Sequence, residues 1–265
     1  MNNESLTNKQ GISIVANFIM GSSLLIGNAG GAKQDAWISV LLGIIMAIPV
    51  IFIYARLTQL YPGKSLFDIF EYTLGKILGK IVSLLFTWYF FHLGALVIRD
   101  VTEFVQVVSF PETPQFFVAL FIGLLLIYTL KKDIGVLVRV IEFILPLIIL
   151  IFITTILLAI PKMNLENMEP LLYNGWKPVL KGGFDLFAFP FAETVVFLTL
   201  FHTVKENKSS PYKIYFLGLF LGGLLLTSAT IRNILILGTS NISNLYFPSY
   251  TAIGIIDIGN FLSRI

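Results

Sequence analysis

The sequence contains no cysteine, only two histidines and few charged residues. Without cysteine the chain has no disulfide bonds, no thiol nucleophile and no thiolate ligands for a metal. The histidines, His92 and His202, lie 110 residues apart, and no matching cluster of carboxylates accompanies them. We therefore expect neither a metal site nor a cofactor.

Charged residues make up 12% of the 265 residues, whereas soluble domains usually carry roughly 25%. The 18 Lys and Arg residues are scattered between apolar runs and form no single basic face, which argues against nucleic acid as a partner. We do not expect an enzyme. Ser22 and Ser23 have no base in a recognisable arrangement, and residues 27–31 lack the Gly-Lys-Ser/Thr ending of a phosphate loop.

Apolar residues fill 56% of the chain, and its mean hydropathy is +0.86. A helix needs roughly 20 apolar residues to cross the hydrocarbon layer. By this criterion the chain is an all-α integral membrane protein with seven complete spans, and residues 250–265 begin like an eighth. The predicted spans are 11–30, 36–56, 81–108, 115–130, 136–160, 184–204 and 213–237.

The connecting segments carry an uneven positive charge. Eleven Lys and Arg residues fall on the N-terminal side of the predicted membrane, and four fall on the other side. This bias predicts a cytoplasmic N-terminus. Residues 64–78 mix apolar and charged side chains, and we expect them to form a short amphipathic helix on the cytoplasmic surface.

Two of the predicted spans contain helix-breaking residues. The first has Gly21, Ser22 and Ser23 near its centre, and the sixth has Pro190 between two phenylalanines. Unwound backbone at membrane depth is tolerated only where protein or a wet cavity satisfies its polar groups. Interrupted helices in corresponding positions of two halves are typical of transporter binding sites. The alternatives are a plain proline kink and close helix packing at the glycine.

Three spans carry ionisable side chains. Arg99 and Glu103, four residues apart on one helical face with His92, predict a paired and wet outer vestibule or a purely structural ion pair. Glu193 follows Pro190 by less than one turn and is the strongest intramembrane candidate for a functional acid, or it hydrogen-bonds backbone freed by the proline. In the seventh span, Gly218 and Gly222 have the spacing of a helix contact. Arg232 of the seventh span and Asp257 of the final segment carry opposite charges and are a candidate ion pair.

An ordered set of short motifs resembles the spore germination permeases, the B-type subunits of Ger-type nutrient receptors, in the amino acid/polyamine/organocation superfamily. The motifs extend over essentially the whole chain. They are residues 10–17 (QGISIVAN), Gly21, 35–38 (DAWI), 61–62 (YP), 65–67 (SLF), Arg99 with Glu103, 113–114 (TP), 164–170, Glu193 and 256–261 (IDIGNF).

The resemblance implies a LeuT-like bundle of two inverted five-helix repeats in the inner membrane of bacterial spores. It also implies A-type and lipoprotein C-type partner subunits and a small nutrient ligand, often an amino acid. Gly21, Leu93 and Pro190 match places that line the pocket of the family, and we expect Ser22 to join them in the first break.

The family continues beyond the position of Ile265. We therefore expect a single permease-like domain truncated to about seven helices and the start of an eighth. Residues 1–160 form the first repeat, and residues 161–265 form an incomplete second repeat. The leading function is a germination receptor subunit that senses a small nutrient. The alternatives are a proton-coupled amino acid transporter acting through Glu193 and a truncated paralogue without activity.

Overall fold

The computed structural model describes residues 6–27, 29–132, 134–201, 210–242 and 244–255, and every regular element in these ranges is a helix. Shorter 3₁₀ and π-helical segments lie between or extend the α-helices. The α-helices are α1 (Asn8–Met20), α2 (Ala36–Leu60), α3 (Leu66–Val108), α4 (Gln115–Lys132), α5 (Ile134–Ala159), α6 (Trp176–Leu186), α7 (Pro211–Ile242) and α8 (Pro248–Gly254).

Six helices of the described chain are long and apolar enough to cross a membrane. They correspond to the second to seventh predicted spans, although the sixth begins at Trp176, eight residues earlier than expected. The first predicted span is represented by α1 and the 3₁₀ helix η1 (Ser22–Leu24), neither of which is long enough alone. The six apolar helices indicate a multi-pass membrane protein.

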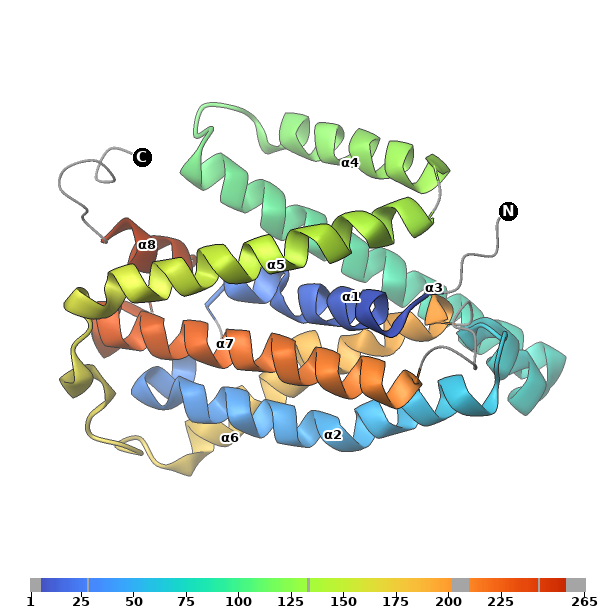
Figure 1. Ribbon diagram of the computed structural model, residues 1–265, viewed down its shortest axis with the longest axis horizontal. Helices are drawn as coiled ribbons and strands as arrows, with labels where there is room; N and C mark the ends of the chain where they lie inside the picture. Colours follow the sequence, from blue (N-terminus) through green and yellow to red (C-terminus); the bar gives the residue numbers. More distant parts are fainter. Residues whose placement is uncertain (1–5, 28, 133, 202–209, 243, 256–265) are drawn as a thin grey trace.

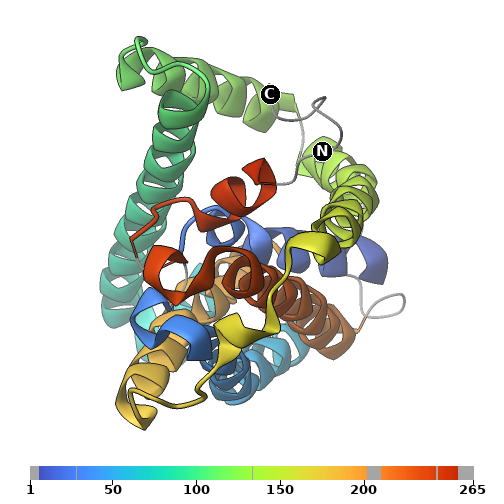
Figure 2. The ribbon, with the colours of Figure 1, turned by 90° about the vertical axis from the view of Figure 1, so that its left-hand side faces the viewer.

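The core of the bundle lies between α1, α2, α6 and α7, which run side by side in Figures 1 and 2. Its largest fully buried side chains include Tyr215 and Ile214 of α7, Phe191 after α6 and Ile19 of α1. Helices α3, α4 and α5 follow one another around the periphery, and α4 has no buried residue. Their exposed faces are rich in Leu, Ile and Phe, a surface suited to lipid but not to water.

Helices α1 and α7 approach closely because small residues of α7 face the α1 side chains. A Cβ atom built on Gly218 would lie 2.5 Å from the Cβ of Val15, and one built on Gly222 would lie 2.9 Å from the Cβ of Ile19. The predicted helix contact at these two glycines is therefore confirmed.

A short helix is present where the amphipathic helix was expected before the third span, and its cytoplasmic location stays a prediction. It forms the first turns of α3, begins with a capping box between Ser65 and Asp68, and buries Leu66 and Ile69. Gly75 interrupts the helical backbone with φ 78° and ψ 171°, a conformation that favours glycine. The chain then folds back so tightly that a Cβ on Gly79 would lie 2.6 Å from the Cα of Glu71.

Enlarging Gly218 tests the α1–α7 contact. Gly218→Ala should lower the free energy of unfolding by about 1–3 kcal/mol, because Val15 must move to admit the new methyl group. Gly123→Ala in α4 is the matched control, since nothing lies within 4 Å of the added Cβ there. Thermal unfolding of the purified protein in detergent should show a lower midpoint for Gly218→Ala alone. Equal midpoints for the two variants would contradict the tight contact.

Candidate ligand-binding site

The first helix ends inside the bundle, as its glycine predicts. Helix α1 starts at a capping box between Thr7 and Gln10 and ends at Gly21, whose backbone N–H donates to the Asn17 carbonyl over 2.8 Å. The chain then turns through η1 and resumes as the 3₁₀ helix η2 (Gly30–Asp35) before α2. Gly21 is exposed, so the backbone at this break is open to an approaching group.

The second interruption lies at Phe189 and Pro190. Helix α6 continues into a π-helical turn, η5 (Phe187–Phe191), in which Phe189 is extended, with φ −132° and ψ 120°. The chain then tightens into the 3₁₀ helix η6 (Ala192–Thr199). The predicted break at the proline is therefore confirmed.

Neighbouring side chains satisfy the backbone around this second break. The Tyr54 hydroxyl of α2 donates to the Ala192 carbonyl over 2.9 Å, and the Thr194 hydroxyl donates to the Phe191 carbonyl over 2.7 Å. Such partners are what irregular backbone needs at membrane depth. The sequence analysis predicted neither hydrogen bond. For Tyr54 the reason is that the sequence of an apolar helix does not specify which neighbouring helix a tyrosine side chain will contact.

The two breaks lie in contacting parts of the bundle. Helix α1 packs against both η5 and η6, and the Phe18 ring meets the Phe197 ring edge-on with centroids 5.1 Å apart. Helix α3 contacts both η1 and η6. Leu93 is one of the few buried residues of α3, with 7% of its surface exposed.

The predicted pocket residues therefore lie on neighbouring segments: α1 contacts η5, and α3 contacts η1 and the η6 helix that follows η5. Gly21 ends α1, Ser22 begins η1, Leu93 lies on α3 and Pro190 lies in η5. The structure brings the segments together, and the binding role of these residues stays a prediction.

Glu193 lies in the first turn of η6, where its carboxyl group interacts with the hydroxyl of Tyr89 from α3. Its Oε2 atom is buried and accepts no hydrogen bond from the described residues. The sequence analysis did not predict Tyr89 as a site residue, although it lies four residues before Leu93 and hence on the same helical face. The arrangement gives the second break one ionisable group and one hydroxyl next to it.

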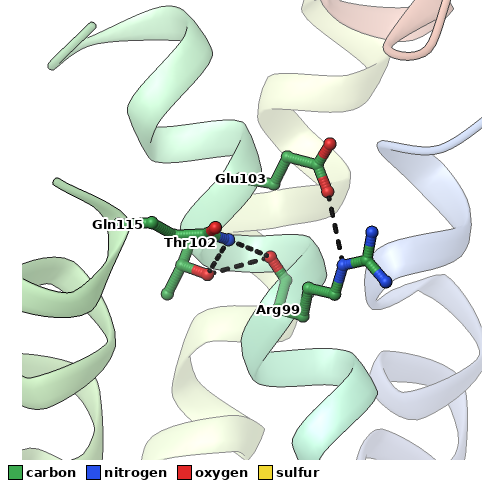
Figure 3. A network of polar contacts seen from close by, with 4 residues as sticks. All are labelled: Arg99, Thr102, Glu103 and Gln115. Atoms are coloured by element: carbon green, nitrogen blue, oxygen red, sulfur yellow. Dashed lines mark hydrogen bonds and ion pairs between the residues drawn. The ribbon is translucent and has the colours of Figure 1, made fainter. Parts of the chain in front are cut away.

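Arg99 and Glu103 form the predicted pair at the far end of α3 from Gly75. The Arg99 Nε lies 3.8 Å from the Glu103 Oε2, and the side chains are 69% and 32% exposed (Figure 3). Gln115 at the start of α4 donates to the Thr102 hydroxyl over 2.9 Å and fixes the two helix ends together. His92 shares the helical face but is exposed, so only part of this face turns toward the bundle.

The same end of α3 meets the connection between α7 and α8. The ring of Phe104 contacts that of Phe247, with centroids 5.2 Å apart, and the Tyr246 hydroxyl interacts with Glu103. The sequence analysis did not predict a role for Tyr246 or Phe247, the two residues of the α7–α8 connection. The contact joins this end of α3 to the α7–α8 connection, and the vestibule stays a prediction.

Arg232 of α7 is buried, and its guanidinium group forms hydrogen bonds. Its Nη2 donates to the Asn233 Oδ1 over 2.9 Å, and Asn233 donates to the Ser249 hydroxyl of α8 over 2.9 Å. Asn233 and Ser249 also line a small cavity, together with Ser23. Asp257, the partner considered for Arg232, lies outside the described residues. Within the described ranges, no group of three or more His, Asp or Glu side chains is placed to hold a metal.

A double-mutant cycle tests whether the Arg99–Glu103 pair is structural. Arg99→Gln, Glu103→Gln and the double variant should give a coupling energy of about 0.2–1 kcal/mol, because an exposed pair gains little over water. Chemical unfolding of each variant in mixed micelles measures the coupling. A value of several kcal/mol would mean that the pair holds the fold rather than lining a vestibule.

Comparison with known proteins identifies the family. The family model described as "Spore germination protein" matches residues 5–265. Spore germination protein KB of Bacillus subtilis (strain 168) is 30% identical over 251 residues, which are 94% of this chain and 67% of that protein. YndE of the same strain, also a spore germination protein, is 30% identical over 67% of this chain and 50% of its own length.

A further relative, spore germination protein A2 of the same strain, is 29% identical over 64% of this chain and 48% of its own length. The chain thus spans between about half and two thirds of the length of the curated relatives it matches. No solved structure matches the chain. The matched family is one of germination proteins and not of enzymes, and this chain belongs to the spore germination protein family.

Proposed function

We propose that the chain is the membrane-embedded subunit of a spore germination receptor and senses a small nutrient. The observation that carries this proposal is the contact between two interrupted helices and α3 in a chain of the spore germination family. Helix ends that meet inside a bundle offer free backbone N–H and C=O groups to a charged ligand. An amino acid, with an ammonium and a carboxylate, suits such ends.

The proposed pocket residues are Gly21, Ser22, Leu93 and Pro190. Among these four residues only Ser22 has a side chain that forms hydrogen bonds, so ligand recognition falls mainly to backbone groups and apolar contact. Ligand binding would shift the balance between two arrangements of the broken helices. The size of that shift is limited by the difference in ligand affinity between the two states.

The proposal also includes the repeat architecture, the membrane location and the partner subunits. Interruptions in the first and sixth spans support a LeuT-like arrangement of two repeats, residues 1–160 and 161–265. The proposed location is the spore inner membrane, with the N-terminus in the cytoplasm. A-type and lipoprotein C-type subunits would read the conformational shift and start germination. Relatives that carry the name spore germination protein support this assignment.

Replacing Gly21 tests the pocket. Gly21→Leu should abolish the germination response to nutrient without lowering the protein level, because a Cβ there would already lie 3.0 Å from the Phe18 carbonyl oxygen. Gly31→Leu is the matched control, since nothing lies within 4 Å of its added Cβ. Spores of a strain that depends on this chain are assayed for loss of refractility, with immunoblots for protein level. An unaltered response in Gly21→Leu would remove the pocket assignment.

A second candidate function is proton-coupled amino acid transport, favoured by the buried Oε2 atom of Glu193 beside the second break. A carboxyl group that must gain and lose a proton inside the membrane needs a partner such as Tyr89, which interacts with it. Transport and sensing differ in whether the ligand crosses the membrane.

Uptake into proteoliposomes separates the two functions. A transporter should accumulate radiolabelled amino acid when a pH gradient is imposed, and Glu193→Gln should abolish the dependence on the gradient because an amide cannot carry the proton. Glu112→Gln, in the exposed α3–α4 connection, is the control and should leave uptake unchanged. If the wild-type protein shows no gradient-driven uptake, the transporter function is excluded and sensing stands alone.

A further inference from the structure

A groove on the outside of the bundle combines apolar walls with one pair of opposite charges. It runs between the first turns of α1 and one face of α5, with Leu221 of α7 in its floor; we call it the α1–α5 groove. Its polar side chains come from the first turns of α1 and from Glu142. The remaining wall, from Leu145 to Ile153, is aliphatic.

The charge pair marks the end of the groove where α1 begins. The Lys9 Nζ lies 3.0 Å from the Glu142 Oε1, and the side chains are 74% and 23% exposed. Lys9 is thus open to solvent or to a lipid headgroup, whereas Glu142 is half-buried against the helices. A headgroup with one negative and one positive group can match both side chains.

Pro146 adds a second acceptor next to the carboxylate. It lies inside α5, four residues after Glu142, and a proline has no N–H to donate to that carbonyl. The backbone oxygen of Glu142 therefore lacks its α-helical hydrogen bond. A primary ammonium has three N–H donors, enough to bind the carboxylate and this carbonyl together.

The length of the groove matches one leaflet of a bilayer. Ile153 lies 11 residues beyond Glu142 on α5, which corresponds to a rise of about 16 Å. The hydrocarbon core of a bilayer is about 30 Å thick, so the groove extends over roughly half of it. An acyl chain anchored at the charged end would lie against the aliphatic wall along its whole depth.

We propose that the α1–α5 groove binds a phospholipid with a primary ammonium headgroup, of the phosphatidylethanolamine class. Its ammonium donates to the carboxylate and backbone carbonyl of Glu142, its phosphate pairs with Lys9, and one acyl chain lies along Pro146 and Ile153. Phosphatidylglycerol has the same phosphate for Lys9 but no ammonium, so Glu142 is left without a cation when Lys9 pairs with the lipid. Phosphatidylcholine carries a quaternary ammonium, which has no N–H to donate.

The position of the groove gives the lipid a consequence for the bundle. Helix α1 carries the Gly21 break and contacts α5 along the groove. A bound lipid bridges the start of α1 to α5 and fixes the first half of the interrupted span. Removal of the lipid should loosen α1 first.

Lipid competition tests the proposal with the full chain. The purified protein is exchanged into micelles containing equimolar phosphatidylethanolamine, phosphatidylcholine and phosphatidylglycerol of identical acyl chains, and retained lipid is counted by native mass spectrometry. Retention of phosphatidylethanolamine should exceed that of the other two by about tenfold, the factor that one hydrogen bond to a charged group provides. Equal retention of the three lipids, retention of none, or preference for phosphatidylglycerol would overturn the proposal.

Two variants locate the site. Glu142→Gln should remove most of the preference, because an amide no longer neutralises the ammonium, whereas Glu112→Gln outside the groove should retain it. An unchanged preference in Glu142→Gln would place the lipid elsewhere and overturn the assignment. If Glu142→Gln fails to fold, Lys9→Gln decides in its place, since Lys9 is exposed. Its loss should lower the total amount of retained phosphatidylethanolamine, and unchanged retention would overturn the assignment.

Discussion

A helix that is broken at membrane depth must be held by its neighbours, and this constraint organises the bundle. Water is absent from the hydrocarbon layer, so each freed N–H or C=O group needs a partner within the protein. Tyr54 supplies such a partner at the second break. Helix α1, which precedes the first break, is held by close packing, because α7 presents Gly218 and Gly222 to Val15 and Ile19 and lets the two backbones approach. The most buried part of the protein is accordingly the set of helices around the breaks.

Helix α3 connects the two breaks to the end of the bundle. It touches η1 and η6, places Leu93 in the interior and brings Tyr89 to Glu193. Farther along, its Arg99 and Glu103 lie near the α7–α8 connection. A ligand that altered the packing at the breaks would therefore press on the helix that also carries the Arg99–Glu103 pair.

The lipid groove and the proposed nutrient pocket share α1. This helix contacts η5 and η6 of the second break, and it contacts α5 along the groove. The first half of the span is thus held between the protein core and the bilayer. Membrane composition and nutrient would both act on the position of a single short helix.

The sequence by itself determined the local features. Apolar run lengths predicted six of the spans, Gly21 and Pro190 predicted the breaks, and four-residue spacing predicted the Arg99–Glu103 pair, because each depends on residues close in the chain. Only the tertiary structure decided which helices meet. Tyr54 with Ala192, Tyr89 with Glu193, and Lys9 with Glu142 join residues from distant helices. An apolar helix in lipid exposes similar residues all around its axis, so its sequence does not specify which face will contact which neighbour.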